Sequence, residues 1–187
     1  NPIHQKVQEN YTLLKPIKAT DFMNLYKKYC NPSSKPEVIK IEATGDTYKG
    51  DVVKGVPHGW GQLVSLRGDL TEGYFQDGKP EGFVRRLSAP TGAGYSGQLR
   101  LDKPIGKGFA IDEKGYITEC NTWKDGLTEG TTTITNPKKE IVFSGLTKEG
   151  KKNGQGAWKD EANKTEYIGI FVDDFLDGPD GEKKWEN

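Results

Sequence analysis

Few residues of this chain have the types and spacing that catalysis or metal binding needs. The histidines are His4 and His58, and the cysteines are Cys30 and Cys120. These four residues lack the spacing of a zinc-ligand motif, and the chain has no H-E-x-x-H or G-x-S-x-G stretch. We therefore expect no metal site and no nucleophilic catalysis. Free thiols are favoured over a bridge for the two cysteines, because they form no disulfide framework.

Two short stretches resemble ligand-binding motifs without meeting their requirements. Residues 92–97 spell G-x-G-x-x-G, but a dinucleotide site needs a following helix, and here a polar stretch and a turn follow. Residues 173–178 resemble the start of a calcium loop. However, Phe175 stands at the third position of the loop, which requires a ligand, and Lys184 stands at the twelfth, where the bidentate glutamate belongs. The sequence thus predicts no cofactor and no enzyme.

Glycine, in contrast, recurs at a regular interval. The chain has 24 glycines in 187 residues. Segments 23 or 24 residues apart begin at Tyr48, Thr71, Tyr95, Glu119, Phe143 and Tyr167. Eleven residues into these segments stand Gly59, Gly82, Gly106, Gly130, Gly154 and Gly178. A self-similar period of this length predicts a repeat array, here of six repeats between residues 45 and 187.

Two further columns of the repeat predict specific backbone roles. Seven residues into the segments stand Gly55, Gly78, Asp102, Gly126, Gly150 and Asp174. A column that accepts only glycine and aspartate predicts a turn with positive φ. Two residues in stand Gly50, Gly73, Gly97, Asn121, Gly145 and Gly169. Because these glycines lie in apolar stretches, we expect either close backbone approach or a ring packed over them.

Apolar side chains occupy the first and fifth positions of most segments. The fifth positions are Val52, Phe75, Leu99, Trp123, Thr147 and Phe171. Residues four apart on a strand share a face, so both columns should line one face. Each segment then forms one β-hairpin, which is marginal alone and needs stacked neighbours. The predicted fold is mainly β, an elongated single-layer antiparallel sheet of stacked hairpins.

The repeat resembles that of the MORN (membrane occupation and recognition nexus) family, whose pattern is roughly Y-x-G-x-F/W-x-x-G-x-x-x-G-x-G. Residues 48–61 match it closely, with His58 at the family's usual histidine position. Residues 143–156 match nearly as well, and the fourth segment departs most, with Glu119 and Asn121. The resemblance covers residues 45–182. It implies the stacked-hairpin fold and a scaffold role.

Residues 1–44 lie outside the repeat. We expect an extended arm, then a short helix over residues 21–30 that Asn31-Pro32 terminates. Its apolar stripe is expected either to cover the chain's own first hairpins or to bind a partner. Val38–Ile41 is expected to form a strand that pairs with the first repeat and blunts the sheet edge.

The expected function is a non-enzymatic structural or scaffold subunit of a larger assembly, cytoskeletal or ciliary, that binds other protein subunits or further copies of itself. The expected partner-binding residues are Tyr48, Phe75, Tyr95, Leu99, Trp123, Phe143, Tyr167 and Phe171. The formal net charge is zero, which argues against nucleic acid, since that partner requires a basic footprint. A peripheral membrane or phospholipid adaptor stays open as the alternative, although neutral charge does not favour it.

A cytoplasmic location, associated with the cytoskeleton or a cilium, fits the scaffold expectation. The sequence begins with Asn1 rather than Met, which indicates a processed chain or a fragment. An organelle such as the mitochondrion therefore also stays open.

Overall fold

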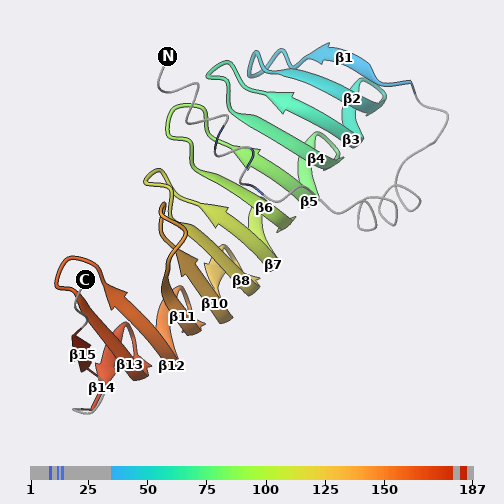
Figure 1. The fold of residues 1–187 in the computed structure, drawn as a ribbon. Helices are drawn as coiled ribbons and strands as arrows, with labels where there is room; N and C mark the ends of the chain where they lie inside the picture. The colour runs from blue at the N-terminus through green and yellow to red at the C-terminus, as the bar shows by residue number, and fades with distance from the viewer. Residues whose placement is uncertain (1–8, 10–11, 13, 15–34, 179–181, 185–187) are drawn as a thin grey trace.

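The computed structural model describes residues 9, 12, 14, 35–178 and 182–184. Glu9 and Thr12, in the segment expected to be an extended arm, are helical. The fold is mainly β, and the strands within residues 35–184 form one antiparallel open sheet (Figure 1). Its described strands are β1 (Glu37–Lys40), β2 (Thr47–Val53), β3 (Val56–Val64), β4 (Leu70–Gln76), β5 (Lys79–Leu87), β6 (Gly94–Arg100), β7 (Lys103–Ile111), β8 (Ile117–Lys124), β9 (Leu127–Thr128), β10 (Gly130–Thr135), β11 (Ile141–Lys148), β12 (Lys151–Asp160), β13 (Thr165–Val172), β14 (Phe175–Asp177) and β15 (Glu182–Lys184). The predicted single-layer sheet of hairpins is confirmed. The helix expected over residues 21–30 lies outside the described residues.

The strands follow one another across the sheet in nearly sequential order. The path runs from β1 through β8, then β10 to β14, while β9 pairs with β8 and β15 pairs with β13. Strand β1 pairs with β2 at the first end of the sheet, in the segment where a strand was expected. Neighbouring hairpins therefore bury each other's backbone groups, as a hairpin that is marginal alone requires.

The turn predicted in the seventh column is present in each of the six repeats of the described sheet. Lys54 and Gly55 have φ of 52° and 78°. Two successive residues with positive φ define a type I′ turn, whose twist matches that of the flanking strands. The same pair of positive φ values recurs at Asp77-Gly78, Leu101-Asp102, Asp125-Gly126, Glu149-Gly150 and Asp173-Asp174. Glycine and aspartate are found at the second turn position because they tolerate this conformation.

The strand register places one residue from each strand in a row across the sheet, which we call the ring row. Directly opposed residues share a face. The row, read through successive pairs, is Tyr48, Leu63, Thr71, Arg86, Tyr95, Ala110, Thr118, Ile134, Phe143, Trp158 and Tyr167. The side of the sheet that carries this row is the ring face, and the opposite side is the outer face.

The register corrects the sequence alignment of the fourth repeat. Thr118, not Glu119, lies opposite Ala110 and Ile134 in the ring row. The cause is an irregularity in β8, where Trp123 pairs with Gly106 but Cys120 already pairs with Gly108. A β-bulge inserts an extra residue into one strand, which shifts all residues before it by one position relative to the repeat.

A second row, which we call the glycine row, lies two residues further along the strands on the ring face. Its members are Gly50, Gly61, Gly73, Val84, Gly97, Gly108, Cys120, Thr132, Gly145, Gly156 and Gly169. A Cβ built on Gly61 would lie 2.2 Å from the hydroxyl oxygen of Tyr48, and one on Gly97 would lie 2.4 Å from that of Tyr95. Both expected roles of these glycines are present, because a Cβ on Gly73 would instead lie 2.4 Å from the backbone carbonyl oxygen of Phe83.

Aromatic side chains of successive repeats contact each other across the ring face. The rings of Tyr48 and Phe75 have centroids 5.0 Å apart and an interplanar angle of 75°. The pairs Tyr95–Trp123 and Phe143–Phe171 have the same edge-to-face geometry, at 5.8 Å and 6.4 Å. The first column of one repeat therefore packs on the fifth column of the next, and both columns lie on one face as expected. Edge-to-face pairs add about 0.5–1.5 kcal/mol beyond their buried area.

The outer face carries a separate apolar cluster in the middle of the sheet. Leu14 is fully buried against Leu87, Phe109 and Ile111. A Cβ on Gly94 would meet Leu14 at 2.7 Å, while the next residue, Tyr95, belongs to the ring row. Because successive side chains on a strand point to opposite faces, Leu14 covers the outer face and leaves the ring face of these strands to its own rings.

Candidate partner-binding groove

The ring pairs alternate with positions where the rings are missing. In each ring pair, the first-column residue of one repeat contacts the fifth-column residue of the next repeat. Six repeats therefore give five positions for such a contact. Three of them are aromatic pairs among the described residues, between the first and second, third and fourth, and fifth and sixth repeats. The remaining two positions hold Thr71 with Leu99, and Thr118 with Thr147. The ring face therefore has two gaps in its aromatic packing.

Each gap coincides with larger side chains in the glycine row. Val84 stands beside Thr71, while Cys120 and Thr132 stand beside Thr118. A tyrosine ring lies flat only where the residues beneath it lack a side chain, as Tyr95 does over Gly97 and Gly108. At each gap the missing ring therefore goes together with the loss of one or both of the glycines that would lie beneath it.

Beneath the second gap, where a ring is missing, a cluster of buried polar side chains is found. Thr132 Oγ1 lies 2.7 Å from Thr147 Oγ1 and donates to Cys120 Sγ at 3.1 Å. Cys120 Sγ in turn donates to the carbonyl of Thr122 at 3.0 Å. Cys120 and Thr132 are at most 2% exposed, and Cys120 is a free thiol. The cluster satisfies its own hydrogen-bonding groups, as buried polar groups must.

The two gaps differ in what the neighbouring strand supplies. Beside Thr71 the ring row continues with Arg86, a long side chain that forms an ion pair with Asp102. Beside Thr118 the row continues with Ile134, whose side chain is much shorter. The first gap is thus occupied by a charged side chain of the protein itself, whereas the second is left open.

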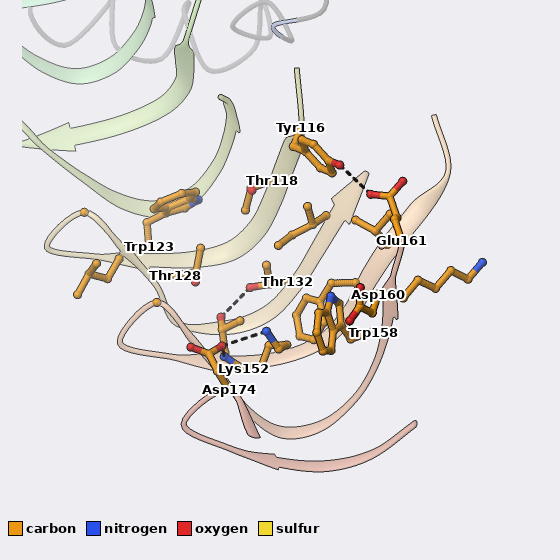
Figure 2. Close-up of a pocket in the computed structure, with 18 residues that line it drawn as sticks. Tyr116, Thr118, Trp123, Thr128, Thr132, Lys152, Trp158, Asp160, Glu161 and Asp174 are labelled. Carbon is orange, nitrogen blue, oxygen red and sulfur yellow. Dashed lines mark hydrogen bonds and ion pairs between the residues drawn. The ribbon is translucent and has the colours of Figure 1, made fainter. Parts of the chain in front are cut away.

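A cavity of about 570 Å³ lies over the second gap, and we call it the threonine cavity (Figure 2). Figure 2 shows Trp123 on one side and Trp158 with Lys152 on the other. Its lining includes four threonines and the ring of Phe143. The threonines are Thr118, Thr128, Thr132 and Thr147. The Trp158 wall is reinforced by Tyr167, which stacks on it at 5.2 Å.

Charged groups surround the cavity in a defined arrangement. Lys152 Nζ lies 4.7 Å from the centre of the Trp158 ring and 3.1 Å from Asp174. Burial alone would raise the pKa of Asp174, but hydrogen bonds from the Lys152 backbone and side chain lower it overall. The ammonium over a tryptophan face is a cation–π contact. Lys152 is thereby held against the wall instead of extending into solvent.

A second carboxylate, Glu161, is fixed at the opposite rim. It accepts hydrogen bonds from the Tyr116 hydroxyl at 2.7 Å and the Asn136 side-chain nitrogen at 2.8 Å. The bond from Tyr116, followed by that from Asn136, lowers the pKa of Glu161, and the same bond raises the pKa of Tyr116. Hydrogen bonds to the charged form favour ionisation, so Glu161 presents a negative charge at neutral pH.

Most of the expected partner-binding residues belong to the core of the ring face. Tyr48, Phe75, Leu99, Phe143 and Phe171 are at most 2% exposed, and Tyr95 is 8% exposed. Trp123 and Tyr167 are partly exposed. Phe143 and Trp123 line the threonine cavity, but the other buried rings mainly hold the repeats together. A partner-binding role for all eight stays a prediction.

The sequence interpretation missed the threonines, Lys152, Trp158 and Glu161. The sequence did contain a signal for one of the threonines, because Thr147 is the polar residue in an otherwise apolar column. Thr118 was hidden by the bulge, which moved the alignment to Glu119. Trp158 and Lys152 both lie in β12, the second strand of a hairpin. In second strands the repeat pattern specifies few residue types apart from the glycines.

The described part of the chain holds no group of three or more histidine, cysteine or acidic residues placed to bind a metal ion. Within the same residues, no helix has the length and apolar character of a membrane span.

No protein-family model matches the chain, and no curated protein matches it. Among solved structures, it is similar to the TCP domain of SAS-4 (dCPAP) from Drosophila melanogaster, determined in complex with a proline-rich motif of Ana2 (dSTIL). The identity is 16% and the TM-score 0.41, over 75% of this chain and 82% of that chain. The partners of the present chain therefore have to be argued from its own surface.

Proposed function

We propose that this chain is a non-enzymatic scaffold subunit that binds protein partners along its ring face, within a cytoskeletal or ciliary assembly. We further propose that its repeats are MORN repeats, on the basis of the residues 48–61 and 143–156 that resemble the family pattern. The observation that carries the binding role is the threonine cavity. It is a 570 Å³ hollow between tryptophan walls, at the second of the two gaps in the aromatic packing of the ring face.

The composition of the cavity favours binding over catalysis. Tryptophan and other aromatic residues dominate the energetics of protein interfaces, and pockets that accept a partner are mostly apolar with a few fixed polar groups. Trp123, Phe143 and Trp158 supply the apolar walls, and Lys152 and Glu161 supply fixed charges. The Cys120 thiol is buried and donates a hydrogen bond to a backbone carbonyl, so it is not presented to the cavity as a reactive group.

Site-specific photo-crosslinking tests the proposal. Leu127 lines the cavity and is 49% exposed, whereas Ile168 is 42% exposed and lies next to Tyr167 on the outer face. A photoreactive benzoylphenylalanine at position 127, in full-length protein added to extract of its source cells, is expected to capture a discrete polypeptide. The same group at position 168 is the matched control. Equal capture from both positions would contradict binding on the ring face.

The membrane alternative makes a different prediction. A peripheral adaptor that binds anionic headgroups sediments with vesicles containing phosphatidylserine or phosphoinositide, and it does so less in high salt. With a formal net charge of zero, we expect the chain to stay in the supernatant at low salt as well. Salt-sensitive co-sedimentation would favour the adaptor function.

A further inference from the structure

We propose that the threonine cavity is an anchor pocket for one aromatic side chain, carried by an extended partner segment with a basic residue beside it. The inference rests on the proposed function and specifies its site. The partner ring would take the place of the ring pair that the protein lacks between its fourth and fifth repeats.

The protein's own ring pairs flank the second gap. Tyr95–Trp123 and Phe143–Phe171 pack on either side of the gap, each in edge-to-face geometry. Trp123 belongs to the first pair and Phe143 to the second, and both line the cavity. A ring inserted here would contact Trp123 and Phe143, and it would restore the continuity of a stack that is interrupted at Thr118 and Thr147. Edge-to-face and offset contacts favour an aromatic occupant over an aliphatic one.

The polar groups beneath the cavity already have hydrogen-bond partners. The hydroxyls of Thr132 and Thr147 and the thiol of Cys120 hydrogen-bond to one another and to backbone carbonyls. An apolar ring that covers these groups leaves none of them without a partner. The desolvation penalty for covering these three groups is therefore small.

The rim of the cavity carries more negative than positive side chains. The charged residues of the lining are Lys152, Lys159, Asp160, Glu161 and Asp174, two positive and three negative. Lys152 and Asp174 pair with each other. Glu161 lies near the Trp158 wall in Figure 2. It accepts hydrogen bonds from the neutral groups of Tyr116 and Asn136, while Lys138 acts on it through charge. A lysine or arginine next to the anchoring ring would pair with this carboxylate, which fixes the orientation of the segment.

Selection of a displayed library of random linear dodecapeptides on the full-length protein tests the proposal. We expect enriched peptides to share an aromatic residue with an adjacent lysine or arginine. Replacing that aromatic residue by alanine should weaken binding at least tenfold, because a buried ring is the usual anchor of an interface. Enrichment of peptides that lack an aromatic residue would overturn the proposal.

A pair of matched variants locates the site. Thr118→Phe fills the cavity, whereas Thr131→Phe adds the same ring at an exposed position in β10. Thr118→Phe should weaken a selected peptide at least tenfold and Thr131→Phe less than twofold, with near-ultraviolet circular dichroism to establish that both are folded. If Thr118→Phe does not fold, the peptide is added to the native chain and the indole N–H resonance of Trp123 is followed by NMR. A shift of this resonance is the result that the anchor pocket predicts.

The possible outcomes test the anchor pocket and the scaffold function separately. Peptides that bind equally well to folded Thr118→Phe, or that leave the Trp123 resonance unmoved, overturn the anchor pocket but not the scaffold function. A library that yields no binder removes the pocket, while crosslinking at position 127 independently tests the scaffold function. Glu161→Gln should weaken a selected basic peptide several-fold and reduce its salt dependence, and an unchanged affinity contradicts the charge pairing.

Discussion

The ring of Tyr48 lies over Gly61, so closely that a Cβ at position 61 would come within 2.2 Å of the tyrosine hydroxyl oxygen. That hydroxyl donates to the carbonyl of Asp51 at 3.0 Å. Tyr95 repeats the arrangement over Gly108 and donates to the carbonyl of Gln98 at 3.1 Å. The glycines beneath these two tyrosines therefore make room for the rings, and each tyrosine both covers two strands and donates to a backbone carbonyl.

Gly61→Ala is predicted to destabilise the protein through this contact. The new methyl group requires Tyr48 to move, and overpacking of this kind typically costs about 1–3 kcal/mol. Lys49→Ala, at an exposed position of the neighbouring strand, should change stability by less than about 0.5 kcal/mol. Urea unfolding of both variants measures the difference. Equal midpoints would show that the ring does not constrain residue 61.

Gly55→Val is predicted to destabilise the first hairpin. Gly55 has φ of 78° in a type I′ turn, and a β-branched residue is strained in this conformation. The left-handed conformation costs about 1–2 kcal/mol for residues with a Cβ. No atom lies within 4 Å of a Cβ at this position, so the cost is conformational and not steric crowding. Gly55→Asn is the control and should lose much less, whereas equal losses for valine and asparagine would contradict the turn assignment.

Two phenylalanines near the C-terminal end of the sheet offer a matched comparison. Phe171 is 1% exposed and packs on Phe143, while Phe175 is 79% exposed. Phe171→Ala should cost about 3–5 kcal/mol if the site cannot collapse, as for other buried rings. Phe175→Ala should stay within about 0.5 kcal/mol. Thermal unfolding followed by circular dichroism distinguishes them, and similar losses would mean that the ring pairs do not hold the repeats together.

The Tyr116–Glu161 pair predicts a specific pH dependence. The pKa of Glu161 is lowered in the folded protein, so its contribution to stability is present above its ordinary value of 4.5 and is lost as the pH falls through the folded value. The pKa of Tyr116 is raised above 10.0, so its contribution is present below pH 10 and is lost as the pH rises through the folded value. Tyr116→Phe should raise the pKa of Glu161 toward 4.5, as measured by carboxyl NMR titration. An unchanged Glu161 titration would show that the hydrogen bond is absent in solution.

The sequence predicted the hairpins, the turns and the shared face because those features repeat, and repetition makes weak signals visible. Thr118 and the threonine cavity could not be predicted in this way, because they arise where the repeat is broken. A single bulge between Cys120 and Trp123 shifts the fourth repeat by one residue, and nothing in the spacing of the glycines reveals it. The role of Arg86 at the other gap depends on which strand lies beside Thr71, which only the register shows.

The buried state of Tyr48 and Phe75 was not predictable from the period alone. A single-layer sheet would expose much of its surface, yet these rings bury each other and lie on glycines, so both are fully buried. Because the paired rings bury each other, little of their surface is available to a partner. The available binding surface lies instead where a ring pair is missing.

Hydrogen–deuterium exchange of the full-length chain, alone and with a partner captured through position 127 or a selected peptide, tests the central claim most directly. The claim is that partners bind on the ring face at the threonine cavity. The account predicts slower exchange in residues 116–134 and 150–161, which line the cavity, and unchanged exchange in the first hairpin, residues 47–64. Protection confined to the first hairpin or to the sheet edge at β1, with no change around the cavity, would contradict it.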